Sequence, residues 1–320
     1  MNFNSFIFPA PDFDCHLVEQ FSDELIYIPT KNLKEYIPCL FLSNRISRLH
    51  KNFVIFFHGN AENIFLSRQM AHGLLDKLNM NIIIVEFPGY SIYKGEASAE
   101  KILENTTVVY DYIKTTFNLE DKNIFVFGRS IGTSPAIYLA SKTNPNALFV
   151  VSSFTSIRSV AGNVVGPLKY FLKDRFFSSD YVKSVKCPTI FIHGKSDPLI
   201  PYNETVELAK NCKSKHKVIL RDYMTHNDFD LFDDIMNPIK DFVNDKDNGI
   251  IVDNEEYDLL KERYGSVLYE QFIPGIYDNV KDYEEKQFEL IHGKRPANNI
   301  QTGNSKKGIL GKIKDILHLS

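Results

Sequence analysis

Residues 123–132 read Asn-Ile-Phe-Val-Phe-Gly128-Arg129-Ser130-Ile131-Gly132, and a helical pattern, Thr-Ser-Pro-Ala-Ile-Tyr-Leu-Ala, follows. An apolar run of strand length therefore passes through G-x-S-x-G into a helix. A serine at the apex of such a tight turn adopts strained backbone angles, so the residues two positions away must lack bulk. The turn also lifts the hydroxyl toward the helix start, where free N–H groups favour negative charge. The stretch predicts Ser130 as a nucleophile, although an ordinary glycine-rich turn is the alternative from the motif alone.

Apolar runs alternate with helical patterns on both sides of this stretch, from about residue 25 to about residue 243. The predicted strands are Leu25–Pro29, Ile37–Leu42, Phe53–Phe57, Ile82–Phe87, Ile124–Phe127, Leu148–Ser152, Thr189–Ile192 and Val218–Leu220. The predicted helices are 63–78, 98–116, 131–142, 201–210 and 227–243. This alternation favours an α/β domain with a mostly parallel sheet of about eight strands and helices on both faces. No helix separates the first two strands, which predicts an antiparallel edge.

The partners of a nucleophile in a G-x-S-x-G turn follow it in the order Ser, Asp, His. Asp197 lies in a proline-flanked loop just after the strand that ends near His193. His226 lies in the loop after the last predicted strand. Each residue alone has an ordinary explanation, a turn aspartate before proline or a surface histidine. Because the requirements are met together and in order, we expect a triad of Ser130, Asp197 and His226, in which the imidazole accepts the serine proton and the carboxylate orients the imidazole.

An oxyanion hole for this triad would use backbone N–H groups. One donor is expected at Ile131, directly after the nucleophile. The other is expected in the loop His58-Gly59-Asn60-Ala61 after the strand Phe53–Phe57, with Asn60 favoured over Ala61. His58 sits at a strand end, where a histidine commonly bonds the loop backbone, and we interpret it as structural.

Composition sets limits on the other functions. Lys and Arg total 37 against 40 Asp and Glu, a net charge of −3. This balance does not favour nucleic-acid binding, which requires an excess of positive charge on one face. The four cysteines show no metal-site spacing, and no HExxH sequence occurs, so we expect reduced thiols and neither metal nor cofactor. The N-terminus is a poor signal peptide and no apolar run could cross a bilayer. The expected location is the cytoplasm.

The flanking and inserted segments are predicted separately. Residues 1–24 precede the domain 25–243, which contains a short cap insertion at about 155–185. Residues 244–320 read as an appendage, with 14 acidic and 5 basic residues between Asp241 and Leu290. Residues 306–320 are predicted to form a basic amphipathic helix, because the five apolar residues from Ile309 to Leu317 fall within about 120° of a helical wheel. Peripheral membrane contact through 306–320 and docking on protein are equal alternatives.

Six short motifs taken together resemble one known family. They are His58-Gly59-Asn60-Ala61-Glu62-Asn63, Pro88-Gly89-Tyr90-Ser91, Gly128-Arg129-Ser130-Ile131-Gly132-Thr133, Ser153-Phe154-Thr155-Ser156-Ile157, Ile192-His193-Gly194-Lys195-Ser196-Asp197 and His226-Asn227-Asp228. In this order they resemble the Bem46-like α/β hydrolases, especially the ABHD17-type depalmitoylases, over about residues 25–243. The resemblance implies the α/β-hydrolase fold, the same triad, and a serine esterase or thioesterase acting on acyl chains. Those depalmitoylases carry an acylated N-terminal cysteine cluster, whereas only Cys15 stands near this N-terminus, so their membrane recruitment is not carried over.

Three functions stay open at this point. The leading one is hydrolysis of an acyl ester or thioester, with a lipidated protein among the substrates considered. The second is a peptidase of the prolyl-oligopeptidase or aminopeptidase kind, which the same triad would serve. The third is a binding module without catalysis, although such a module has no need for a strained serine. Serine at the turn excludes the enzymes of this fold that use an aspartate nucleophile.

Overall fold

The computed structural model describes residues 7–31, 35–44, 47, 51–160 and 174–252. The middle of the predicted cap and almost all of the predicted appendage, including its basic helix at 306–320, lie outside these residues. The domain that carries Ser130 is described here by itself.

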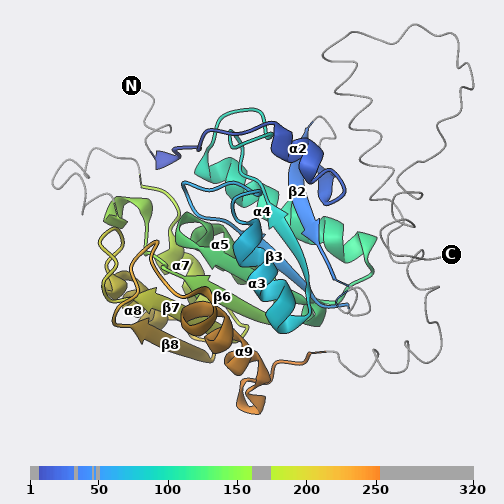
Figure 1. Cartoon of the computed structure of the whole chain (residues 1–320). Helices are drawn as coiled ribbons and strands as arrows, with labels where there is room; N and C mark the ends of the chain where they lie inside the picture. The colour runs from blue at the N-terminus through green and yellow to red at the C-terminus, as the bar shows by residue number, and fades with distance from the viewer. Residues whose placement is uncertain (1–6, 32–34, 45–46, 48–50, 161–173, 253–320) are drawn as a thin grey trace, which may run out of the picture. The chain divides into compact units, whose positions relative to one another are not determined.

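An eight-stranded sheet forms the centre of this domain (Figure 1). Its spatial order is β1-β2-β4-β3-β5-β6-β7-β8. The first two strands pair antiparallel with each other, β2 pairs antiparallel with β4, and all other pairs are parallel. The bounds are β1 Leu25–Pro29, β2 Tyr36–Leu42, β3 Phe53–Phe57, β4 Asn81–Val85, β5 Ile124–Arg129, β6 Ala147–Val151, β7 Thr189–Gly194 and β8 His216–Arg221. The predicted fold class and the antiparallel edge are confirmed.

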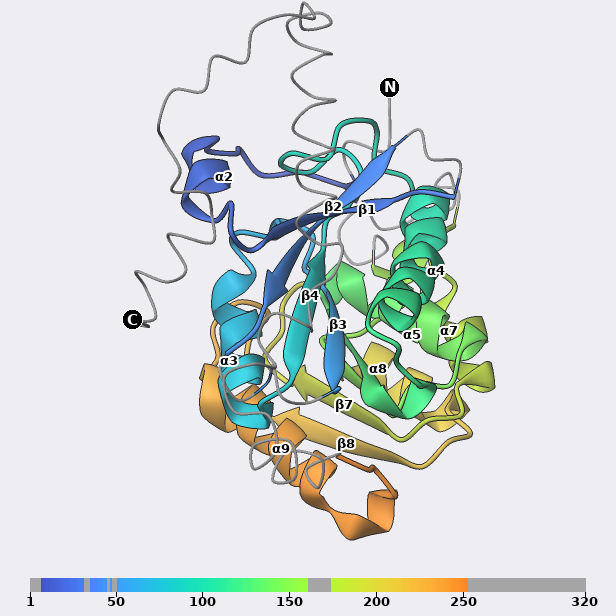
Figure 2. The ribbon, with the colours of Figure 1, turned by 90° about the vertical axis from the view of Figure 1, so that its right-hand side faces the viewer.

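Helices cover both faces of the sheet, as Figure 2 shows. On one face α3 packs against β4 and, with η6, against α9. On the other face α4, α5, α7 and α8 follow one another across the sheet. The helices are α2 His16–Gln20, α3 Arg68–Leu78, α4 Ala99–Thr116, α5 Thr133–Lys142, α7 Ser178–Tyr181, α8 Tyr202–Asn211 and α9 Asn237–Asn244. Shorter helical turns are η2 Asp121–Asn123, η3 Ser130–Gly132, η5 Val182–Ser184, η6 Leu231–Met236 and η7 Lys246–Asn248.

The apolar runs become strands because the helices cover both sides of them. Every residue of β3, β4 and β6 is buried. A strand covered on one face only would alternate between apolar and polar residues, and these do not. The edge strand β8 is the exception, since its first three residues are exposed.

Two helices begin later than the sequence predicts, and a side-chain cap explains each case. Asn63 Oδ1 accepts hydrogen bonds from the N–H groups of Phe65 and Leu66, which holds 63–67 as turns before α3. Asp230 Oδ1 accepts from Phe232 and Asp233 and starts the wide π-helical turn η6, so residues 227–230 stay in a loop. Short polar side chains compete in this way with helical backbone bonding.

The parallel strands deliver several loops to one place. Phe57 of β3 pairs with Gly128 of β5, and Gly194 of β7 pairs with Arg221 of β8. Strands that run parallel and in register end at the same edge, so the loops after β3, β5, β7 and β8 all lie there. That edge is where open α/β sheets hold their ligands.

The described ends of the cap are tied to this edge. The Thr155 N–H donates to Glu204 Oε2 on α8 at 2.9 Å, and Ser156 Oγ donates to Asp174 Oδ2 at 3.0 Å. Of the two neighbouring phenylalanines that follow, Phe176 is fully buried, whereas Phe177 is 42% exposed. The two described ends of the predicted cap are therefore bonded to each other, and one of them is bonded to α8.

Candidate active site

The turn around Ser130 has the strained form that its sequence predicts. Ser130 has a φ of 52°, in the left-handed region that residues with a Cβ rarely adopt. A Cβ on Gly128 would lie 2.3 Å from the carbonyl oxygen of Gly132, and a Cβ on Gly132 would lie 2.3 Å from that of Phe57. Both contacts are with backbone, which cannot move aside as a side chain can. The two glycines allow β3, β5 and the start of α5 to approach closely.

Gly132→Ala is expected to destabilise the protein by about 1–3 kcal/mol, the usual range for overpacking, and toward its upper end. It should also lower activity, because the methyl group would push on the end of β3. Urea unfolding measures the first effect and ester turnover the second. The matched control is Gly73→Ala in α3, where the nearest atoms to a Cβ belong to the side chains of Leu231 and Met236, from 3.3 Å. If both variants were equally stable, close packing at Gly132 would not be what requires glycine.

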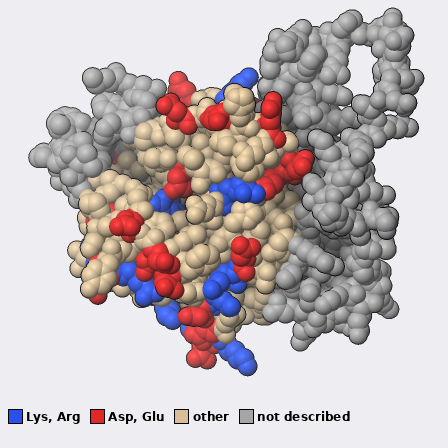
Figure 3. All heavy atoms as spheres, viewed as in Figure 1, with Lys and Arg blue, Asp and Glu red and all other residues tan. Residues whose placement is uncertain are grey.

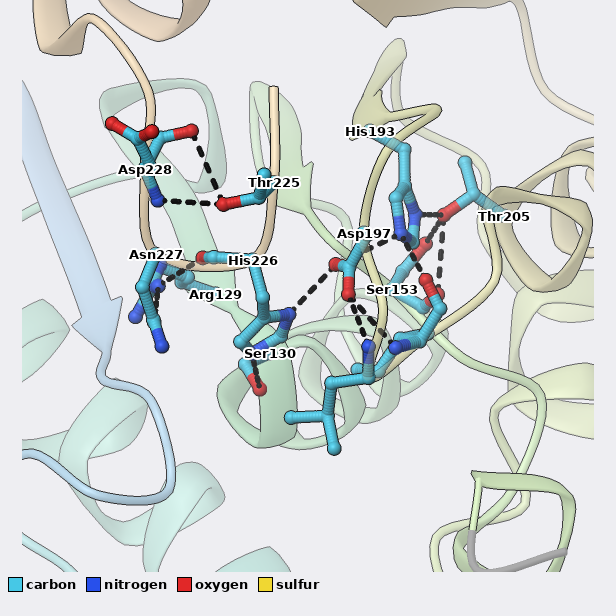
Figure 4. Close-up of polar contacts among 12 residues, drawn as sticks. Arg129, Ser130, Ser153, His193, Asp197, Thr205, Thr225, His226, Asn227 and Asp228 are labelled. Atoms are coloured by element: carbon cyan, nitrogen blue, oxygen red, sulfur yellow. Dashed lines mark hydrogen bonds and ion pairs between the residues drawn. The ribbon is translucent and has the colours of Figure 1, made fainter. Parts of the chain in front are cut away.

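The structure brings the three predicted triad side chains together. His226 Nε2 lies 3.0 Å from Ser130 Oγ, and His226 Nδ1 lies 2.7 Å from Asp197 Oδ2 (Figure 4). All three residues are buried, at 5% to 7% exposure. A continuous chain of hydrogen bonds thus runs from hydroxyl to carboxylate, with an imidazole in the middle. This is the geometry in which an imidazole can take a serine proton.

The loop of His226 is a tight turn closed by its neighbours. The Thr225 N–H donates to the Asp228 carbonyl at 2.9 Å, and the Asp228 N–H donates to Thr225 Oγ1 at 2.9 Å. Figure 4 shows this turn beside Ser130. The imidazole is therefore presented from a loop whose backbone is fixed on both sides.

Asp197 is held by four donors. Its Oδ1 accepts the backbone N–H groups of Leu199 and Ile200, both at 2.9 Å. Its Oδ2 faces His226 and lies 3.4 Å from His193 Nε2. Burial alone would raise the pKa of Asp197, but the bonds to His193, His226 and the Ile200 N–H outweigh it and hold that pKa well below the usual 3.8. The carboxyl group is thus kept ionised opposite the imidazole.

His193 contacts Asp197; it stands in one of the six motifs, but its position there predicts no role in the site. Its Nε2 also lies 2.9 Å from the Ile200 carbonyl oxygen, to which it donates, and its Nδ1 lies 2.6 Å from Thr205 Oγ1. Thr205 Oγ1 lies in turn 2.6 Å from Ser153 Oγ. The buried polar groups behind Asp197 are therefore bonded to one another, as burial requires.

The expected oxyanion donors come from two elements, Ile131 from η3 and Asn60 or Ala61 from the loop after β3. Ile131 is in η3 at the start of α5, where the first N–H groups have no partner inside the helix. The Asn60 side chain is occupied elsewhere: its Nδ2 donates to the Ile7 carbonyl at 2.8 Å and its Oδ1 accepts from Tyr90 Oη at 2.7 Å. It would therefore contribute through its backbone N–H, and the choice between Asn60 and Ala61 stays a proposal.

His58 forms a fully buried pair with Glu86. His58 Nδ1 lies 2.8 Å from the Gly59 carbonyl oxygen and Nε2 lies 2.9 Å from Glu86 Oε1. Both partners present oxygen acceptors, an arrangement that favours a proton on each ring nitrogen and therefore the imidazolium form. Burial lowers the pKa of His58, but the bond to Glu86 and the charges of Glu86 and Glu62 raise it above 6.5. Through these bonds His58 fixes the loop, in keeping with its structural interpretation.

The His58–Glu86 pair predicts a pH-dependent stability. Because the pKa of His58 is raised in the folded protein, its protonated form contributes fully to the stability of the fold below pH 6.5. This contribution is lost as the pH rises through the raised pKa. His58→Gln should cost about 3–5 kcal/mol at pH 6, the range for breaking one side of a buried pair, and less at alkaline pH. Urea unfolding from pH 6 to pH 10 measures this. The exposed His216→Gln is the control, and an equal cost at every pH would mean that His58 is neutral.

Other features of the described residues are reported as they stand. None of the described helices combines the length and apolar character needed to cross a bilayer. Within 7–31, 35–44, 47, 51–160 and 174–252, no three His, Cys, Asp or Glu side chains are grouped to hold a metal ion. On the face of the domain seen in Figure 3, acidic and basic side chains of the described residues are interspersed. That face has no concentrated basic surface of the kind that binds phosphates.

The comparisons with known proteins define the class. Residues 89–227, which include Ser130, Asp197 and His226, match the family model described as serine hydrolase (FSH1). The esterase Pf2001 of Pyrococcus furiosus superposes with a TM-score of 0.58 at 18% identity, over 73% of this chain and 96% of that one. Est1E of Butyrivibrio proteoclasticus does so with a TM-score of 0.52 at 17% identity, over 69% and 96%. The chain therefore has the α/β-hydrolase fold, and the part that carries Ser130, Asp197 and His226 is similar to a serine hydrolase family.

Within this class the chain is similar to a particular group of animal proteins. It is 26% identical to human alpha/beta hydrolase domain-containing protein 17B over 207 residues, which are 65% of this chain and 70% of that protein. It is 29% identical to alpha/beta hydrolase domain-containing protein aho-3 of Caenorhabditis elegans over 190 residues. That match spans 59% of this chain and 57% of the nematode protein, less than two thirds of its length. The resemblance expected from the six motifs is confirmed.

Proposed function

We propose that the protein cleaves acyl esters or thioesters through an acyl-enzyme on Ser130, with His226 as base and Asp197 as the orienting acid. One observation carries the proposal. The imidazole of His226 is within hydrogen-bond distance of both the Ser130 hydroxyl and the Asp197 carboxylate, at 3.0 Å and 2.7 Å. A hydroxyl becomes a useful nucleophile only when a base of this kind can accept its proton.

Acylation follows from these contacts. Ser130 Oγ attacks the acyl carbon while its proton moves to His226 Nε2. The Nδ1–H of the resulting imidazolium stays bonded to Asp197, whose negative charge stabilises it. The backbone N–H of Ile131, with that of Asn60 or Ala61, donates to the oxyanion. Losing one such donor typically costs about 3 kcal/mol of transition-state stabilisation.

Acylation is completed when His226 gives its Nε2 proton to the departing alcohol or thiol, which leaves the acyl group on Ser130. Deacylation then uses the same groups. A water molecule then attacks the acyl carbon and passes a proton to His226. When the Ser130 oxygen leaves, it takes that proton back and releases the carboxylic acid. No metal or cofactor is needed for any step.

A protein S-palmitoyl thioester is the finer substrate we propose. Support comes from the resemblance of the six motifs to the ABHD17-type depalmitoylases and from the similarity to human protein 17B. The solved esterases support the fold alone at their level of identity. The substrate class also implies a cytoplasmic enzyme that works at a membrane surface, where lipidated proteins lie.

The test begins with a fluorophosphonate probe, which labels only an activated serine. Wild type should be labelled, and absence of labelling would favour the binding module. Turnover is then compared between p-nitrophenyl esters of increasing acyl length, an S-palmitoylated peptide and aminoacyl p-nitroanilides. Preference for long esters and the thioester supports the proposal, while preference for the anilides favours the peptidase.

The predicted basic helix at 306–320 is proposed as the membrane contact. Its lysines would face anionic headgroups and its apolar stripe would enter the interface. Deleting 306–320 should reduce co-sedimentation with anionic liposomes and leave turnover of a short soluble ester unchanged. Unchanged co-sedimentation would reject this role.

A further inference from the structure

A single arginine, Arg129, lies directly before the triad serine. It is the last residue of β5 and is 5% exposed, although its side chain carries a full charge. A buried guanidinium needs partners for its N–H groups, because moving the charged group out of water without such partners costs free energy. Its partners therefore show what it does.

The guanidinium group of Arg129 bonds to two loops. Its Nη2 donates to the carbonyl oxygen of His226 at 2.6 Å and to Asn227 Oδ1 at 2.9 Å (Figure 4). Its Nη1 forms an ion pair with Glu62 in the loop after β3. The Phe229 ring lies 5.4 Å away and covers the group on one side. One side chain thus joins the loops that follow β3 and β8 to the end of β5.

The Glu62 contact reaches the backbone of the expected oxyanion loop. Glu62 Oε2 accepts from the Gly59 N–H at 3.2 Å and from Ser67 Oγ at 2.9 Å. A Cβ on Gly59 would lie 2.9 Å from Arg129 Nη1, so the guanidinium packs directly on this backbone. Gly59 immediately precedes Asn60. The ion pair therefore fixes the loop at the residue before the favoured second donor.

The contact with His226 is equally specific. Arg129 bonds to the main-chain oxygen of the base and not to its ring, so the imidazole is free to take up and release a proton. Glu62 balances the charge of Arg129. Lysine could not replace Arg129 here. The planar guanidinium donates to acceptors that lie in different directions, whereas the single ammonium group of lysine does not.

We propose that Arg129 is a positioning residue that sets the base and the second oxyanion donor at the right distances from Ser130. The proposal rests on the proposed function, since it assigns a role within that mechanism. A displacement of about 1 Å at reacting groups can lower a rate by about 100-fold. Loss of Arg129 would loosen both loops, although the side chains of Ser130, His226 and Asp197 would all still be present.

The test compares Arg129→Met, Arg129→Lys and Glu62→Gln with Arg68→Met. The control also removes an arginine from an ion pair, with Glu24, beside the aromatic ring of Phe21. Each variant is measured by urea unfolding, by the kcat and KM of p-nitrophenyl butyrate hydrolysis, and by the rate of fluorophosphonate labelling. Where Arg129→Met does not fold, Arg129→Lys and Glu62→Gln carry the same comparison.

Arg129→Met should lower kcat by about 10- to 100-fold and slow labelling, with little change in KM, because reacting groups are misplaced and substrate binding is not. Arg129→Lys should recover part of the rate, and Arg68→Met should match wild type. Unchanged kcat in folded Arg129 variants would overturn the positioning role, as would a loss that merely follows the unfolded fraction. Wild type that neither labels nor turns over substrate would instead overturn the proposed function, and this role with it.

Discussion

Ser130→Ala is expected to lower kcat for ester hydrolysis by roughly 10⁶-fold, the loss seen when the nucleophile of a serine hydrolase is removed. Ser130 Oγ is the atom that lies 3.0 Å from His226 Nε2, and alanine leaves that imidazole with no proton to accept. Fluorophosphonate labelling should vanish as well. Residual turnover above about one hundredth of wild type would rule out Ser130 as the nucleophile.

Ser130→Gly separates loss of the hydroxyl from loss of the fold. The φ of 52° is strained for serine and alanine but relaxed for glycine. The glycine variant should therefore be as inactive as Ser130→Ala, yet more stable to urea than Ser130→Ala by up to about 1 kcal/mol. Inactivity in both, despite different stabilities, assigns the loss to the missing oxygen. If activity instead followed stability, the turn itself would be what matters.

The fold could be predicted because its strands are buried on both faces. Runs such as Phe53–Phe57 are apolar at every position, and this signal depends on the sequence of the run alone. The helix starts could not be placed as well. Asn63 and Asp230 each accept hydrogen bonds from two backbone N–H groups, and a single short side chain then decides where a helix begins. Many such polar residues occur in loops, and few act as caps.

The three triad positions could be predicted because each follows a strand. Parallel strands end at one edge, so a residue just after β5, β7 or β8 is brought to the same place whatever its loop does in detail. Arg129 and His193 could not be assigned in this way. Their bonds to the loops of Glu62, His226 and Ile200 depend on how those loops pack, which no periodicity in the sequence encodes.

Asp197→Asn should lower kcat by about 10⁴-fold without unfolding the protein. The backbone decides how the new amide lies. Oδ1 accepts two N–H groups, from Leu199 and Ile200, so the amide oxygen must take that position. The amide nitrogen then faces His226 Nδ1 and donates to it. This fixes the imidazole proton on Nε2, where it blocks acceptance of the Ser130 proton. Steady-state kinetics and labelling rates measure the effect.

Asp222→Asn is the matched control for this variant. Asp222 lies on the loop before His226 but is exposed and pairs with Lys195, so its loss should leave kcat unchanged. Urea unfolding between pH 3 and pH 7 adds an independent readout. Because the pKa of Asp197 is held below its usual 3.8, its ionised form stabilises the fold above that value and loses this contribution as the pH falls below it. The stability difference between wild type and Asp197→Asn should therefore shrink toward pH 3. A difference that stayed constant would mean that the charge of Asp197 is not what His193 and His226 stabilise, and the tautomer argument would fail with it.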